Sequence, residues 1–214
     1  MAGRFITFEG PDGAGKTSVL SALIPIVEKH VAMPVTLTRE PGGADISEKI
    51  RTLILDPANV AMDPRTEALL YAASRRQHLI EVIDPALAAG ALVICDRFVD
   101  SSVAYQGGGR QIGEEAVLAM NHFATGGQGP ELTVYLDIDS AAGLARIQAH
   151  QASRQYDRLD RESLAFHQRV RAAYLKLAKA EPARIKTVDA SQPLEQVVAA
   201  CAKVLAAHLG DSWQ

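Results

Sequence analysis

The sequence Gly10-Pro11-Asp12-Gly13-Ala14-Gly15-Lys16-Thr17 has the residue types and spacing of a phosphate-binding loop. It stands between an apolar segment typical of a strand, 4–8, and an amphipathic segment typical of a helix, 16–30. Glycines let consecutive N–H groups turn toward an anion, and the helix that follows adds its positive end. A chance glycine turn is the alternative, and the complete motif disfavours it. The loop, with Ser18 after it, therefore predicts a binding site for a nucleoside triphosphate.

Two side chains of this motif have roles set by their chemistry. Lys16 can reach the β- and γ-phosphates, and the hydroxyl of Thr17 can bind Mg²⁺.

Apolar strand-like segments alternate with amphipathic helical segments along the rest of the chain. The further expected strands are 35–38, 91–95, 132–138 and 185–188, and the pattern ends in a helix over 193–209. Such alternation predicts an α/β fold with a parallel sheet covered on both faces. With the phosphate loop, it indicates a P-loop NTPase three-layer sandwich with a five-stranded parallel sheet flanked by helices. Without a repeat or a convincing linker, residues 1–214 are expected to form a single domain.

Several local signals predict how the helices begin and end. Pro25 should kink or shorten the first helix, because proline lacks an N–H and clashes with the preceding turn. Asp63 followed by Pro64 predicts an N-cap for a helix that runs to about residue 89. Asp100 or Ser101 is expected to cap a short helix, and Ser140 another.

Composition limits the class of protein and its partners. The net charge of −3 argues against general nucleic-acid binding, and no apolar run is long enough to span a membrane. The two cysteines, Cys95 and Cys201, have no paired spacing that would suggest a disulfide framework or a zinc site. We therefore expect a cytoplasmic protein without a nucleic-acid or membrane partner.

The sequence Asp96-Arg97-Phe98 follows the third expected strand. The carboxylate of Asp96 would lie beside the phosphate loop, where it could hold Mg²⁺ through water. Arg97 would project into the crevice where α/β proteins bind ligands, and its planar fork suits a phosphate. A structural ion pair is the alternative for this arginine.

Two helical spacings suggest an acceptor pocket. Ser102, Tyr105 and Gln106 would share one side of a helix and could bind a base edge and a sugar. Tyr71 and Arg75 are four residues apart, so a stacking ring could accompany a phosphate-binding arginine. The alternatives are a polar surface helix for the first group and a core tyrosine with a solvated arginine for the second.

A basic series recurs every four residues at Arg146, His150, Arg154 and Arg158. If it is helical, it could bring an arginine over a phosphoryl group in transfer, and such arginines can be worth about 10³–10⁵ in rate. A solvated basic helix face is the alternative for at least one or two members.

Taken together, these motifs resemble the thymidylate kinase family over essentially the whole chain. The resemblance rests on four stretches: Phe8 to Thr17, Arg39-Glu40-Pro41-Gly42-Gly43, Asp96-Arg97-Phe98, and Asp100 to Arg110. The last two together are highly specific. The resemblance implies Mg²⁺-dependent phosphorylation of dTMP to dTDP by ATP, for dTTP synthesis, in a homodimer. Apolar stretches around Leu69 and Leu118 could form the dimer surface or serve as core.

The resemblance also implies roles for individual residues. Asp12 would contact the substrate sugar or orient phosphate-site groups, and Arg97 would bind the dTMP phosphate with Arg39 and Arg75 nearby. Tyr71 would stack on thymine, and Tyr105 would lie under the deoxyribose. The remaining expected substrate contacts come from Glu40, Pro41, Arg51, Ser101, Ser102 and Gln106, with Glu40 and Asp96 also near the metal and its waters.

The catalytic arginine in this family lies either in the phosphate loop or in a lid. The interior of the loop, Pro11 to Ala14, contains no basic residue, so the resemblance implies a short mobile lid at about 148–161. Arg154 is the first candidate and Arg146 or Arg158 the next. Some relatives have arginines where this chain has Gln148 and His150, so the lid follows the family pattern least closely.

Two other functions remain open at this point. The chain could be a nucleotide kinase for another base or for a nucleoside acceptor. It could instead be a non-enzymatic phosphate-loop module that binds ATP and transfers nothing, although such a module would not need an acceptor pocket.

Overall fold

A five-stranded parallel sheet forms the centre of the molecule. The computed structural model describes residues 3–149 and 158–214. The strand order across the sheet is β2-β3-β1-β4-β5, and every neighbouring pair is parallel. The strands are β1 Arg4–Glu9, β2 Val35–Arg39, β3 Leu92–Asp96, β4 Leu132–Asp137 and β5 Ile185–Asp189. Since β1 lies between strands reached by connections in opposite directions, its carboxyl end is the point where an α/β sheet opens a crevice for ligands.

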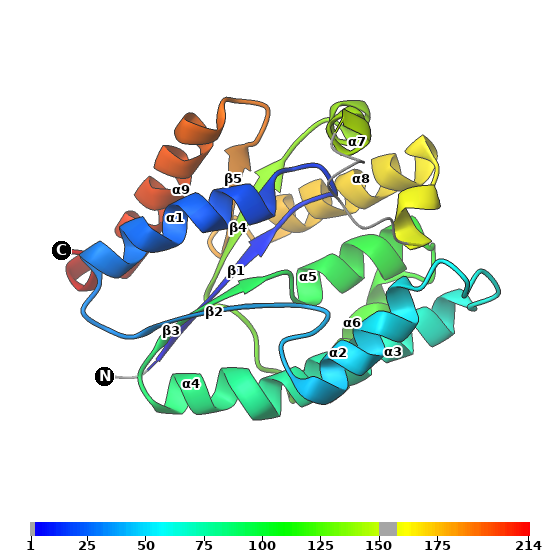
Figure 1. Ribbon diagram of the computed structural model, residues 1–214, viewed down its shortest axis with the longest axis horizontal. Coiled ribbons are helices and arrows are strands. Elements are labelled where there is room, and N and C mark those ends of the chain that lie inside the picture. Colours follow the sequence, from blue (N-terminus) through cyan, green and yellow to red (C-terminus); the bar gives the residue numbers. More distant parts are fainter. Residues whose placement is uncertain (1–2, 150–157) are drawn as a thin grey trace.

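Helices cover both faces of the sheet, which gives three layers (Figure 1). Helices α1 and α9 pack on one face against Ile6, Phe8 and Ile94. The other face carries α8 and the helical segments that precede β3 and follow it. The helices are α1 Lys16–His30, α2 Asp45–Leu55, α3 Pro64–His78, α4 Asp84–Ala88, α5 Val99–Ser102, α6 Glu114–Thr125, α7 Ser140–Ala149, α8 Leu164–Ala180 and α9 Leu194–Leu209.

The alternation of side chains along β1 and β3 explains why these strands are central. Ile94 contributes to the core under α1 and α9, whereas Val93 and Cys95 contribute to the core on the other face. Phe5 and Phe98 meet edge to face in that second core, with ring centroids 5.0 Å apart. A strand that buries both faces reads as a continuous apolar run, which is why the sequence predicted these two strands well.

The structure confirms the expected five-stranded α/β fold and corrects some details of the helices. Helix α1 keeps its full predicted length through Pro25. Asp63 accepts hydrogen bonds from the N–H groups of Arg65 and Thr66, as an N-cap does. The long helix expected over 64–89 contains a π-helical turn, Leu79–Ile83, just before Pro85. Because Pro85 has no N–H to donate, the wider turn is a way to continue the helix past it.

Two predicted caps are wrong. Asp139 Oδ1 accepts hydrogen bonds from the N–H groups of Ala141 and Ala142, so Asp139 and not Ser140 caps α7. Helix α5 begins at Val99 without a side-chain cap, so Asp100 and Ser101 lie inside its first turn. Their side chains face the interior, where Arg184 donates to Asp100 and Ser101 donates to Glu9. Asp100 and Ser101 therefore bond to residues far away in the sequence and do not cap the helix.

The helix expected to carry Ser102, Tyr105 and Gln106 on one side also differs from the prediction. Only Val99–Ser102 is α-helical, and Val103–Gly109 continues it as a π-helical segment. Gly109 packs so closely on α8 that a Cβ there would lie 2.7 Å from the ring of Phe166. None of the helices within residues 3–149 and 158–214 is long and apolar enough to cross a membrane.

Candidate active site

A cavity of about 700 Å³ opens at the carboxyl edge of the sheet. The phosphate loop and the start of α1 form one wall, with Asp12, Lys16 and Thr17 among the lining residues. All the side chains that the sequence proposed as substrate contacts line the same cavity: Arg39, Glu40, Pro41, Arg51, Tyr71, Arg75, Arg97, Ser101, Ser102, Tyr105 and Gln106. Segments far apart in the sequence therefore meet at one site.

The phosphate loop has the backbone that its glycines allow. Gly13 has a φ of 80°, and a Cβ there would lie 2.2 Å from the carbonyl oxygen of Gly143 on α7. Gly10 and Pro11, the first two residues of the loop, are buried and do not line the cavity, and their carbonyl oxygens accept hydrogen bonds from the ammonium of Lys16 at 2.9 and 3.3 Å. Burial and the neighbouring Arg97 lower the pKa of Lys16 to about 8. An incoming phosphate would offer this ammonium a stronger partner than the loop carbonyls.

Arg97 binds the phosphate loop directly. Its backbone N–H donates to the carbonyl oxygen of Phe8 on β1, which places the side chain beside the loop. One end of its guanidinium donates to Asp12 Oδ1 at 2.8 Å, and another N–H donates to the carbonyl oxygen of Gly10 at 3.0 Å. The guanidinium also lies over the ring of Tyr105, 4.9 Å from its centroid. Arg97 has a φ of 70°, a backbone conformation that costs energy for a side-chain-bearing residue and is frequent at functional sites.

Asp12 completes this arrangement. Its other carboxylate oxygen accepts a hydrogen bond from the hydroxyl of Tyr105 at 2.8 Å. Burial opposes the charge on Asp12, but the charges of Arg97 and Lys16 outweigh it and lower its pKa. The carboxylate is therefore ionised at neutral pH and holds both the arginine and the tyrosine in place.

Glu9, at the end of β1, lies close to these groups, and no role for it was predicted from the sequence. It is fully buried and accepts hydrogen bonds from the N–H of Phe98, the hydroxyl of Ser101 and the hydroxyl of Tyr174. Burial and the nearby carboxylate of Asp100 raise the pKa of Glu9 to about 7. A charged residue at the end of a central strand was the signal in the sequence for such a buried polar centre.

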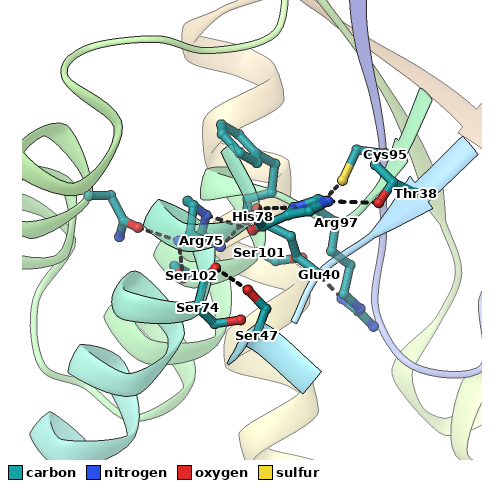
Figure 2. Close-up of polar contacts among 12 residues, drawn as sticks. Thr38, Glu40, Ser47, Ser74, Arg75, His78, Cys95, Arg97, Ser101 and Ser102 are labelled. Atoms are coloured by element: carbon teal, nitrogen blue, oxygen red, sulfur yellow. Dashed lines mark hydrogen bonds and ion pairs between the residues drawn. The ribbon is translucent and has the colours of Figure 1, made fainter. Parts of the chain in front are cut away.

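Glu40 lies between two basic side chains (Figure 2). Its two oxygens accept hydrogen bonds from Arg75 Nε at 2.7 Å and from His78 Nδ1 at 3.0 Å. Arg75 is 2% exposed and also donates to Ser102 Oγ, Asn121 Oδ1 and the carbonyl oxygen of Phe98. The structure thus places both residues in the cavity wall, with their polar atoms engaged by protein partners.

A further wall of the cavity, here called the base-side wall, combines Tyr71 on α3 with Ser102 and Gln106 from the segment 99–109. Ser102 and Gln106 are both 2% exposed, which rules out the alternative of a polar surface helix. Tyr71 is half-buried, and burial with the nearby carboxylate of Glu67 raises its pKa. Gln106 donates through Nε2 to Glu67 Oε1 at 2.9 Å.

Two further predicted arginines lie at the end of β2 and on α2. Arg39 is exposed at the rim and pairs with Glu48 at 2.8 Å, and Arg51 donates to the carbonyl oxygen of Pro41 at 2.9 Å. Both arginines and Pro41 line the cavity.

Thr17 and Asp96 suit the Mg²⁺ expected from the sequence. Thr17 is exposed to the cavity at the start of α1. Asp96 is beside Phe8 in the sheet register, and its Oδ1 is buried without a hydrogen-bond partner in the described part of the chain. The described residues contain no cluster of three or more acidic, histidine or cysteine side chains suited to a metal. A Mg²⁺ ion that is also bound by phosphates and water needs only one or two protein ligands.

A second part of the cavity wall lies beside the phosphate loop, and apart from Arg146 it was not predicted. It consists of Arg146 and Ile147 on α7 with the loop after β5 and the start of α9, through Ala190, Gln192, Leu194 and Val197. Arg146 donates to the carbonyl oxygens of Ala190 and Ser191 at 2.9 and 3.4 Å. The sequence did contain a signal, because the carboxyl end of the fifth strand must lie at the same edge as the phosphate loop.

The three arginines proposed for the lid, Arg146, Arg154 and Arg158, differ in where they lie. Arg154, the first choice, and His150 lie outside the described residues, as does most of the expected mobile lid. Arg146 borders the cavity as described above. Arg158 is buried, where it pairs with Glu67 and donates to the carbonyl oxygen of Ile54 at 3.0 Å.

Comparisons with known proteins agree with this site. The family model described as thymidylate kinase matches residues 8–201. The thymidylate kinase of Lacticaseibacillus casei (strain BL23) is 70% identical over 201 residues, which cover 94% of each chain. That of Latilactobacillus sakei subsp. sakei (strain 23K) is 66% identical over 206 residues, or 96% of each chain. A crystal structure of thymidylate kinase from Ehrlichia chaffeensis superposes with a TM-score of 0.75 at 32% identity, covering 96% of this chain and 99% of that one. On these similarities the chain belongs to the thymidylate kinase family.

Proposed function

We propose that this chain transfers the γ-phosphoryl group of ATP to the 5′-phosphate of dTMP and forms dTDP, a precursor for dTTP synthesis. The observation that carries the proposal is the bond between Arg97 and Asp12, which joins an acceptor arginine to the donor loop within one cavity. Donor and acceptor phosphates bound on these two elements would lie next to each other, as direct transfer requires.

The residues of the chain supply alignment and positive charge. Lys16 is placed to move from the loop carbonyls to the β- and γ-phosphates of ATP, and Arg97 to bind the phosphate of dTMP. Bound Mg²⁺, for which Thr17 and Asp96 are the proposed holders, would neutralise charge on the triphosphate. The acceptor phosphate is already ionised at neutral pH, so no general base is needed. Ser102, Gln106 and Tyr71 are proposed to bind the base.

A panel of acceptors tests the proposal. In a coupled assay with ATP and Mg²⁺, we expect dTMP to be the preferred acceptor among dTMP, dUMP, UMP, CMP and AMP. Preference for another nucleotide would assign the chain to a different base. Binding of ATP without transfer to any acceptor would indicate a non-enzymatic module and contradict the proposal.

We further propose that the chain works as a homodimer through the exposed apolar face of α3 and α6. These helices pack on each other. Their outer surface carries Leu69, Leu118 and Phe123, the last of which is 90% exposed. A ring so exposed on a regular helix is a common feature of protein interfaces.

We also propose that the reaction takes place in the cytoplasm. Cys95 and Cys201 are both buried free thiols, which suits a reducing compartment.

A further inference from the structure

Glu67 on α3 lies behind the base-side wall of the cavity and is 1% exposed. Its Oε1 accepts hydrogen bonds from Gln106 Nε2 at 2.9 Å and from Arg110 Nε at 3.2 Å. Its Oε2 accepts from Arg110 Nη2 at 3.1 Å and from Arg158. Four donors from two other segments of the chain therefore meet on one buried carboxylate.

The charge on Glu67 decides which atom of Gln106 faces it. Burial opposes ionisation, but the hydrogen bonds and charge of Arg110, with the hydrogen bond from Arg158, outweigh it and lower the pKa of Glu67. An ionised carboxylate only accepts hydrogen bonds. The amide group of Gln106 that points toward Glu67 must therefore be its NH₂, because the carbonyl oxygen would meet a second acceptor.

The other end of the same amide is consequently the one offered to the cavity. Gln106 lines the cavity, and its side-chain oxygen Oε1 accepts no hydrogen bond from the residues that the structure describes. Glu67 contributes nothing to the lining and touches the site through Gln106.

We infer that Glu67 is a positioning residue for base selection: it fixes the amide of Gln106 so that a hydrogen-bond acceptor, and not a donor, faces the base. This inference rests on the proposed function, in which Gln106 meets the base of the acceptor nucleotide. An acceptor at this place favours a base with a ring N–H, such as N3–H of thymine. It disfavours cytosine, whose N3 is itself an acceptor.

The substitution Glu67→Gln tests this inference because it replaces an acceptor-only group by one with both polarities. The carbonyl oxygen of the new amide should turn to Arg110 and Arg158, whose charges need an acceptor. Its NH₂ then faces Gln106, whose amide must flip and present NH₂ to the cavity. We expect the ratio of dTMP affinity to dCMP affinity, measured by calorimetry without ATP, to fall about tenfold or more.

Kinetics with dTMP give a second measurement. Since Gln106 is proposed to bind the base and not the reacting phosphates, Glu67→Gln should raise KM for dTMP and leave kcat and KM for ATP near the wild-type values. A purely structural role would lower kcat and weaken both substrates together, and would contradict the inference.

The matched control is Glu162→Gln. Glu162 Oε1 accepts a hydrogen bond from Arg110 Nη1 at 2.5 Å, and Glu162 has no hydrogen bond to Gln106 among the described residues. It should keep the wild-type preference for dTMP. An equal loss of preference in this control would assign the effect to Arg110 and overturn the inference.

The double variant Glu67→Gln with Gln106→Glu keeps the test decisive if the single variant does not fold. It exchanges the two groups, so an acceptor again faces the base, and we expect dTMP to remain preferred over dCMP. Loss of that preference would contradict the inference.

The wild-type protein separates this inference from the proposed function. If it does not bind dTMP, the proposed function itself fails. If it prefers dTMP and Glu67→Gln keeps the same preference, only the role of Glu67 fails.

Discussion

Arg97 Nη2 donates a hydrogen bond to Asp12 Oδ1 at 2.8 Å, and this bond ties the carboxyl end of β3 to the phosphate loop. Tyr105 reinforces it, because its hydroxyl donates to Asp12 while its ring lies under the guanidinium. The two halves of the proposed site are thus held in one arrangement before any ligand arrives. Such preorganisation lowers the entropy cost of aligning two phosphates.

Replacing Arg97 should separate the two substrates. In Arg97→Ala we expect KM for dTMP to rise by about 10- to 100-fold, as for loss of a charged hydrogen bond, and KM for ATP to change far less. Steady-state kinetics with each substrate varied in turn measure this. Arg171→Ala is a suitable control, because Arg171 pairs with Asp137 at 2.9 Å and does not line the cavity. Equal weakening of ATP and dTMP in Arg97→Ala would contradict the acceptor role.

Glu9 should make stability depend on pH. Its pKa of about 7 in the folded protein exceeds the ordinary value of 4.5, so the folded state binds a proton that the unfolded state releases. This contribution to stability is complete below pH 4.5 and is lost as the pH rises to about 7, with a magnitude of the order of 3 kcal/mol.

Denaturant unfolding at several pH values checks this expectation. Relative to wild type, Glu9→Gln should lack the loss between pH 4.5 and 7, because the amide does not titrate. Glu195→Gln, at an exposed carboxylate on α9, should keep the wild-type pH dependence. Parallel curves for wild type and Glu9→Gln would show that Glu9 is ionised throughout this range.

Gly143 on α7 should be required for close packing on the phosphate loop. A Cβ at this position would lie 2.8 Å from the carbonyl oxygen of Asp12. We expect Gly143→Ala to cost about 1–3 kcal/mol of stability and to raise KM for ATP, because the loop or α7 must move. Gly129→Ala is the matched control, since a Cβ there has open space around it. Calorimetric melting and ATP kinetics measure both effects, and identical behaviour of the two variants would refute the packing argument.

Phe123 should determine the oligomeric state. Placing a charge in an apolar interface by Phe123→Asp should convert the proposed dimer into a monomer in analytical ultracentrifugation. Val60→Asp changes another exposed apolar side chain, outside α3 and α6, and should leave the dimer intact. A Phe123→Asp variant that remains dimeric at micromolar concentration would place the interface elsewhere.

The parts of the structure that could be predicted from the sequence are those set by local signals. Helix α1 follows the phosphate-loop motif and has the predicted bounds. The site residues could be proposed because their motifs stand at the ends of strands, where a parallel sheet brings them together.

What the sequence did not reveal depends on partners far away along the chain. Asp100 looked like a helix cap, but its carboxylate is bonded to Arg184, 84 positions later. Glu67 and Arg158 lie 91 positions apart, and no spacing rule links them. The π-helical segment at Val103–Gly109 likewise reflects packing on α8, which local propensity does not encode.

ATP bound on the phosphate loop is proposed to phosphorylate dTMP in the same cavity. Formation of dTDP from ATP and dTMP by Lys16→Ala, compared with wild type, tests this proposal most directly, because Lys16 is the charge placed for the transferring phosphates. We expect wild type to form dTDP and the variant to lose nearly all of this activity, while its melting temperature and dTMP binding stay close to wild type. Normal dTDP formation by a folded Lys16→Ala variant would contradict the account.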